Sequence, residues 1–191
     1  MRALFFFFLL CVGGATALQQ HVPRRAALGT GVASAYFAAM GPAVGVTACK
    51  PNANNCWSTE SVGKNKMEPW KWPSSTSRSS AIATLKEVLA AYPREGQGDV
   101  DKGGWAYAEG DLADGAARLE FKSGVGQFAK FFNGGKPFVD DVEFTVGTDA
   151  VAVKSASRVG DSDLGVNAKR LNYIAAKLRD KAWDAPDVGS L

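Results

Sequence analysis

Charged and hydroxyl side chains are concentrated in the segment SASRVGDSDLGVNAKR, residues 155–170, which follows an apolar stretch. Arginine binds carboxylates and phosphates through paired hydrogen bonds, and the free N–H groups at the start of a helix attract anions. The segment is therefore either a site for an anionic or polyhydroxylated ligand, or a structural joint in which the same charges pair internally.

Two carboxylates precede this segment in the stretch FVDDVEF. If the two stretches form a hairpin, Asp141 lies at about the height of residues 155–157, and Arg158 can pair with Asp140, Asp141 or Asp163. Carboxylates also perform acid–base chemistry without histidine, so a ligand site or an Asp/Arg active site stays open beside the structural interpretation. The candidate ligand-binding residues are Asp140, Asp141, Ser155, Arg158, Asp163, Asn167 and Arg170.

The single histidine, His21, lies in a segment that we expect to be removed. Its loss excludes a Ser-His-Asp triad, a Cys-His pair and a His-ligated zinc site. The motif SGVGQFA resembles a dinucleotide-binding loop but follows a strand of alternating charge, and the acidic turn DVDKGGWAYAEG lacks essential calcium ligands. We therefore predict no catalytic residue, no metal and no cofactor.

The first 48 residues contain three arginines and no acidic residue, which is typical of targeting segments. Residues 1–17 form an apolar run behind Arg2 that ends in Ala-Thr-Ala, as in a signal peptide. Residues 18–48 carry Arg24-Arg25 before a Gly- and Ala-rich stretch, as in a transit region followed by a twin-arginine signal. Two signals in tandem predict passage through two membranes.

Two other interpretations of this region stay open. Residues 26–48 are uncharged and long enough to remain as a membrane anchor. The sequence VTAC also matches a bacterial lipobox, in which Cys49 would become a lipidated amino terminus.

Residues 49–191 are electrically balanced, because three of the 22 Lys and Arg precede them and 19 remain against 19 Asp and Glu. This balance gives no electrostatic reason to expect nucleic acid. Cys49 and Cys56 enclose turn-forming Pro and Asn residues, and an exported protein favours a disulfide between them. A buried free Cys56 is the alternative.

The hydrophobic periodicity predicts an α+β fold: a single small domain with a mostly antiparallel four-stranded sheet and two helices on one face. Helices are expected near 78–91 and 165–182, the second capped by Ser162 or Asp163. Strands are expected at 104–111, 116–123, 138–146 and 150–158. We therefore expect residues 49–191 to comprise three parts: an extended Trp/Pro/Ser arm at 49–80, an α+β domain at 81–183 and a loose tail at 184–191.

Within the arm, EPWKWP places Trp70 and Trp72 on the same face of an extended backbone. They either dock on the core of the domain or anchor a partner protein, for which Trp is favoured.

Three stretches, NNCWSTES, FVDDVEF and SASRVGDSDLGVNAKR, together resemble the domain of unknown function 1499 family over roughly residues 53–180. The residues that match its third motif are Arg158, Gly160, Asp163, Gly165, Asn167 and Arg170. The family often has Arg where this chain has Lys154, which weakens any bidentate carboxylate contact there. The resemblance implies a domain and no particular activity.

The presequence resembles that of a thylakoid lumen protein from an alga with a complex plastid, although Leu18 stands where such presequences usually carry Phe. We therefore expect a non-catalytic accessory protein that binds or helps assemble a photosynthetic membrane complex, with Trp70 and Trp72 as candidate contacts. One alternative is a small-ligand binder or enzyme. Another is a peripheral lipid binder, because cations gather on the last helix.

Overall fold

The computed structural model describes residues 44–124 and 133–189. Residues 1–43 of the targeting segments predicted at 1–17 and 18–48 lie outside these ranges, as does most of the Gly- and Phe-rich segment that resembles a dinucleotide-binding loop.

Four antiparallel strands follow one another across the sheet: β3 (Trp105–Glu109), β4 (Ala116–Lys122), β5 (Val139–Val146) and β6 (Ala150–Ser157). Along β4, β5 and most of β6 every second residue is buried, because side chains alternate between the two faces of a pleated sheet. The buried face is lined by apolar side chains such as Leu119, Phe144 and Val153. These four strands were predicted at nearly the same residues.

The predicted four-stranded sheet is wrong in its strand count. Two further strands, β1 (Cys56–Ser58) and β2 (Trp70–Lys71), pair antiparallel with β6, which gives six strands with the main order β1-β6-β5-β4-β3. Both lie in the segment predicted as an extended arm. They are too short to show an alternating pattern, and backbone hydrogen bonds to the edge of β6 define them.

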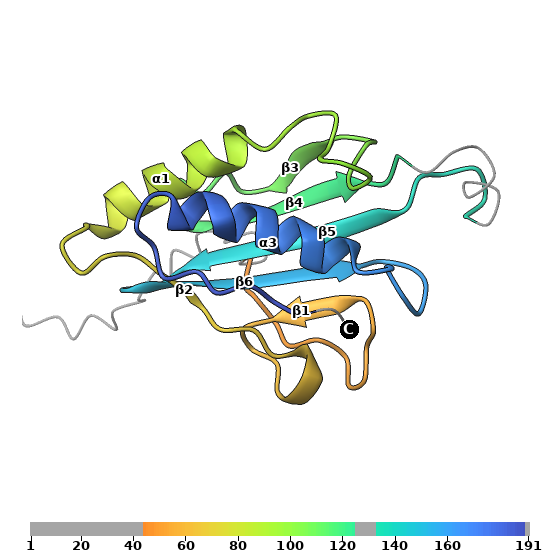
Figure 1. Ribbon diagram of the computed structural model, residues 1–191, viewed down its shortest axis with the longest axis horizontal. Coiled ribbons are helices and arrows are strands. Elements are labelled where there is room, and N and C mark those ends of the chain that lie inside the picture. Colours follow the sequence, from red (N-terminus) through yellow and green to blue (C-terminus); the bar gives the residue numbers. More distant parts are fainter. Residues whose placement is uncertain (1–43, 125–132, 190–191) are drawn as a thin grey trace, which may run out of the picture. The chain divides into compact units, whose positions relative to one another are not determined.

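Two helices, α1 (Arg78–Ala90) and α3 (Val166–Arg179), lie on the same face of the sheet (Figure 1). The side chain of Ser77 accepts the N–H of Ser80 at 3.1 Å and so caps α1. The apolar stripes of both helices pack into the core, where Leu85 and Ile174 are fully buried and Ile82 is partly buried. The α+β class and the antiparallel pairing are confirmed.

The core extends into the predicted arm and tail. Trp70 is fully buried, with its ring centroid 6.1 Å from that of Phe144, and Trp72 packs against Trp183 at 5.7 Å. The tail, predicted to be loose, is held by buried side chains as far as Val188. Both tryptophans therefore lie in the core, which is one of the two placements that the sequence allowed.

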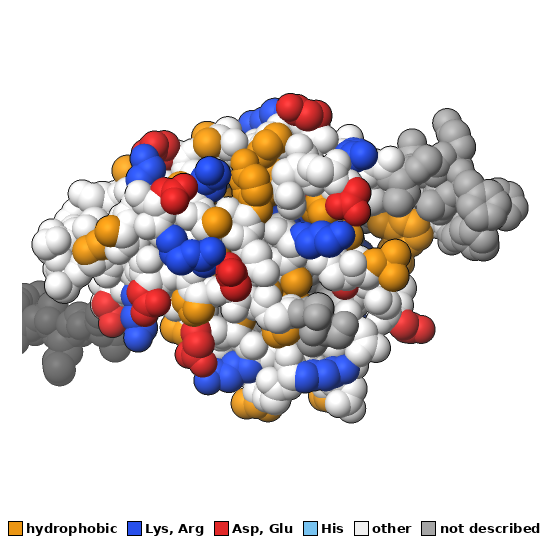
Figure 2. All heavy atoms as spheres, viewed as in Figure 1, with side chains coloured by type: hydrophobic (Ala, Val, Ile, Leu, Met, Phe, Trp, Pro, Cys, Tyr) orange, Lys and Arg blue, Asp and Glu red, His pale blue; other side chains and the backbone are white. Residues whose placement is uncertain are grey.

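The surface over the helices carries acidic and basic side chains interspersed, without a large patch of one sign on the face that Figure 2 shows. The opposite face of the sheet carries charged side chains from β4, β5 and β6. Residues 44–48 run alongside β6, where the Ser58 hydroxyl donates to the Thr47 carbonyl at 2.8 Å and Lys154 Nζ donates to Thr47 Oγ1 at 2.7 Å. This short segment therefore belongs to the folded domain by its contacts.

A chain that begins at Cys49, the cleavage product predicted from the sequence, should be less stable than one that begins at Val44. Ser58 is fully buried, and removal of Thr47 leaves its hydroxyl without an acceptor, a cost of about 1–3 kcal/mol. Urea denaturation of both oxidised chains measures the difference. Ser58→Ala should recover part of the loss in the shorter chain only, and equal unfolding free energies of the two chains would contradict the assigned contact.

Candidate functional site

Arg170, on α3, is the centre of a sealed polar cluster. Its side chain is 0% exposed, and all five of its N–H groups have acceptors. Two are accepted by the carboxylate of Asp101 and one by Asp140 at 2.6 Å. The remaining two are accepted by Ser155 Oγ at 3.1 Å and by Asn167 Oδ1 at 2.8 Å. No donor is left for a ligand.

The cluster joins four parts of the chain: the loop before β3, the strands β5 and β6, and α3. The Tyr92 hydroxyl donates to Asp101 at 2.6 Å, and the Phe121 ring lies 4.6 Å from the guanidinium. Burial disfavours the charged form of Arg170, but its bonds to Asp101 and Asp140 outweigh this and raise its pKa. Burial, reinforced by Asp101, raises the pKa of Tyr92 as well. Both groups therefore keep their protons.

Asn167 extends the cluster towards β1 and the start of α3. Its side-chain amide donates to Asp163 at 2.7 Å, to Ser157 at 3.1 Å and to the Asn55 carbonyl at 3.2 Å. Asp163 also accepts the backbone N–H groups of Gly165 at 3.1 Å and Asn167 at 2.7 Å, which holds the first turn of α3. The predicted N-cap at Ser162 or Asp163 is wrong, because the N-cap residue is Gly165, which has a left-handed backbone with φ of 75° and no side-chain cap.

Asp141 and Arg158 lie on the other face of the sheet, because successive residues of a strand point to opposite faces. Arg158 donates to both oxygens of Asp141, at 2.7 and 2.8 Å, and also to Glu120. Arg118 donates to Asp141 at 2.8 Å. Burial alone would raise the pKa of Asp141, but the hydrogen bonds from Arg158 and Arg118 lower it. The seven candidate ligand-binding residues therefore do not form one site. Asp141 and Arg158 lie on the exposed face of the sheet, and the other five belong to the cluster around Arg170 and its extension through Asn167.

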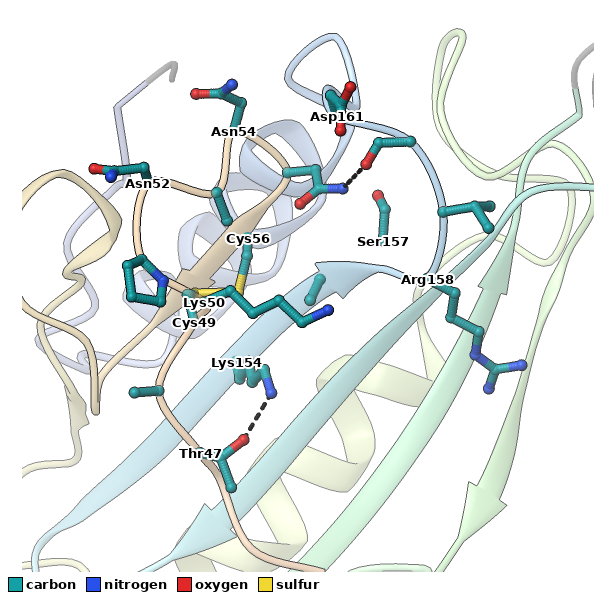
Figure 3. A pocket seen from close by; sticks show the side chains of 17 residues that line it. Thr47, Cys49, Lys50, Asn52, Asn54, Cys56, Lys154, Ser157, Arg158 and Asp161 are labelled. Atoms are coloured by element: carbon teal, nitrogen blue, oxygen red, sulfur yellow. Dashed lines mark hydrogen bonds between the residues drawn. A yellow bond between two sulfur atoms is a disulfide. The ribbon is translucent and has the colours of Figure 1, made fainter.

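A pocket of about 840 Å³ lies between the disulfide loop and the end of β6 (Figure 3). It is open to solvent and lined by residues 47–56, Lys154 and residues 156–161. The predicted disulfide between Cys49 and Cys56 is present and forms part of the wall. Asn55 Nδ2 donates to the Gly160 carbonyl at 2.6 Å and ties the two walls together.

Next to this pocket, Glu143 faces Lys154 across 3.8 Å. Its side chain is 17% exposed, and its Oε2 atom has no hydrogen-bond partner among the described residues. Burial raises the pKa of Glu143, and the positive charge of Lys154 opposes the shift only in part. This carboxylate therefore destabilises the folded state when it is charged.

Among the residues of these groups that the sequence did not single out are Asp101, which was interpreted as part of a turn, and Tyr92, Arg118 and Glu120, which lie in none of the motifs. Asp101 has a left-handed backbone with φ of 59°, which fits the turn, yet its carboxylate points inwards to Arg170. A buried arginine on an apolar helix stripe is the signal that should have prompted a search for a distant carboxylate.

The pocket suits binding better than covalent chemistry. Ser157 is its hydroxyl nearest the cluster, but Ser157 Oγ accepts an N–H from Asn167 and has no base beside it among the described hydrogen bonds. Within the described ranges, no three His, Cys, Asp or Glu side chains are grouped to hold a metal ion.

The fold and the cluster define a small α+β domain whose motif residues hold helix α3 on an antiparallel sheet. The family model described as "Protein of unknown function (DUF1499)" matches residues 46–178, and the chain belongs to this family. No curated protein and no solved structure matches the chain. None of the helices in the described ranges is long and apolar enough to cross a membrane.

Arg170→Met should destabilise the protein far more than Arg158→Met. The first change leaves Asp101 and Asp140 buried without their countercharge, at a cost of about 3–5 kcal/mol. The second removes a side chain that is 41% exposed and leaves Asp141 paired with Arg118, so it should cost about 1 kcal/mol or less. Urea denaturation checks the order, and equal costs would argue against the sealed cluster.

Glu143→Gln should stabilise the protein at neutral pH by about 1 kcal/mol, since it removes a poorly solvated charge. Because the folded-state pKa is raised, the stability from protonated Glu143 is present below its ordinary value of 4.5 and is lost as the pH rises through the raised pKa. The gain should therefore vanish below pH 4.5. Unfolding free energies across this range test it, with the exposed Glu95→Gln as a control that should show no such gain.

Proposed function

We propose that this protein is a non-catalytic accessory protein of the thylakoid lumen that binds a photosynthetic membrane complex or assists its assembly. The location rests on the tandem export signals of residues 1–48. The disulfide between Cys49 and Cys56 supports an exported destination, because such bonds persist in oxidising compartments.

The saturation of Arg170 is the observation that carries the non-catalytic role. Catalysis needs a group that is free to exchange a proton or to attack a substrate. The motif residues Asp163, Asn167 and Arg170 instead direct their hydrogen bonds at one another and at the surrounding core. What they accomplish is the placement of α3 and of the loops around its start.

Exposed apolar side chains on these loops support a contact with another protein. Val62 and Leu164 are each 87% exposed, and Leu164 has a left-handed backbone with φ of 54°, which is uncommon for a residue with a side chain. Both loops are held by Asn54, which accepts from Lys64 Nζ at 2.6 Å and forms a β-bridge with Ser162. Apolar groups on ordered loops lose little freedom when they bind.

Affinity capture from gently solubilised thylakoids tests the proposal. The tagged wild-type protein should recover subunits of one photosynthetic complex, identified by mass spectrometry. The double variant Val62→Asp/Leu164→Asp should lose most of this recovery, because a buried charge without a partner opposes binding. Ala83→Asp adds an acidic group at an exposed position of α1 and should retain it. Recovery of the free monomer alone by the wild type would contradict the proposal.

A further inference from the structure

We propose that the pocket beside the Cys49–Cys56 disulfide binds the phosphate group of a ligand. This phosphate site is separate from the contact with a membrane complex that is proposed above, and it does not depend on that contact.

The pocket is lined by three cations, one of which has no carboxylate partner among the described residues. Its lining contains Lys50, Lys154 and Arg158 against one carboxylate, that of Asp161. Figure 3 shows the Lys50 side chain extending from the disulfide loop across the pocket towards β6, which carries Lys154. Lys50 forms no ion pair with any described residue, whereas Arg158 is neutralised by two carboxylates on the sheet. Lys154 faces Glu143 at 3.8 Å and donates one N–H to Thr47 Oγ1 at 2.7 Å, so Lys50 supplies the unpaired charge for an anion and Lys154 can add a further N–H donor.

Ser157 adds a neutral donor that is already oriented. Its Oγ accepts the amide N–H of Asn167 at 3.1 Å, and its own O–H has no acceptor among the described residues. Because Ser157 lines the pocket, this O–H is available to an oxygen atom placed there.

The arrangement of donors favours phosphate over carboxylate. A flat carboxylate is matched by the planar fork of arginine, and the Arg158 fork is occupied by Asp141 and Glu120. Ammonium groups act as point charges, and the donors come from separate lining segments: Lys50 from the disulfide loop, Lys154 from β6 and the Ser157 hydroxyl from the end of β6. Donors from separate segments suit a tetrahedral group, whose oxygens point in several directions.

The ligand is larger than phosphate itself. The volume of about 840 Å³ lies in the range of pockets for small organic molecules, and Pro51, Ala156 and the disulfide give the wall an apolar part. The disulfide and the bond from Asn55 to Gly160 fix the walls before binding, which lowers the entropic cost. The phosphate therefore belongs either to an anionic lipid headgroup or to a soluble phosphate ester.

Titration of the oxidised full-length chain with inorganic phosphate, at constant ionic strength in chloride, tests the site. The amide resonances of Asn55, Ser157 and Gly160 should shift on binding. Lys50→Gln and Lys154→Gln should each weaken the affinity by about tenfold, the effect of one charge-assisted contact. Lys50 has no described bond to lose, so its variant should fold normally. The exposed Lys122→Gln, outside the pocket, should bind like the wild type.

Flotation with vesicles distinguishes the two sources. Vesicles of phosphatidylcholine with and without phosphatidylglycerol are compared for the wild type and Lys50→Gln, so that any binding by the shared apolar presequence cancels. If the wild type prefers vesicles with phosphatidylglycerol and Lys50→Gln loses this preference, the ligand is an anionic lipid headgroup. Lysine-dependent binding of inorganic phosphate without that preference supports a soluble ester. If neither probe responds to Lys50 or Lys154, the proposal is overturned.

Discussion

The burial of the Arg170 charge is the constraint on which the rest of this structure depends. An arginine removed from water must find an acceptor for each of its N–H groups, or the folded state loses several kcal/mol. The acceptors come from the loop before β3, from β5, from β6 and from α3 itself. Any shift of α3 along the sheet would break these bonds together, so one side chain fixes the position of the helix and of the loop that precedes it.

The pleat of the sheet then decides what each charged residue does. Asp140 and Asp141 are neighbours in sequence, yet one is part of the buried cluster and the other pairs with arginines on the opposite face. The helix-covered face is therefore structural. The polar groups that can bind other molecules lie on the opposite face and at the end of β6.

Asn167 connects the two regions physically. Its Oδ1 atom accepts from Arg170 in the cluster, and its amide donates to Ser157 and to the Asn55 carbonyl at the pocket wall. The motif that holds α3 thus also orients the pocket. A structural role and a binding role need not compete for the same atoms, because the asparagine side chain has separate donor and acceptor groups.

The sequence by itself determined both helices and the four longer strands, because these follow from local periodicity and turn chemistry, and it favoured the disulfide over a free Cys56. It also indicated that the charges of residues 155–170 would need partners. Only the tertiary structure decided which partners: Asp101 lies far from Arg170 along the chain, and no local pattern encodes that pairing. The same holds for β1 and β2, which exist because β6 offers them an unpaired edge. Long-range pairing depends on which surfaces meet in space, whereas spacing along the chain reports only each segment's own preference.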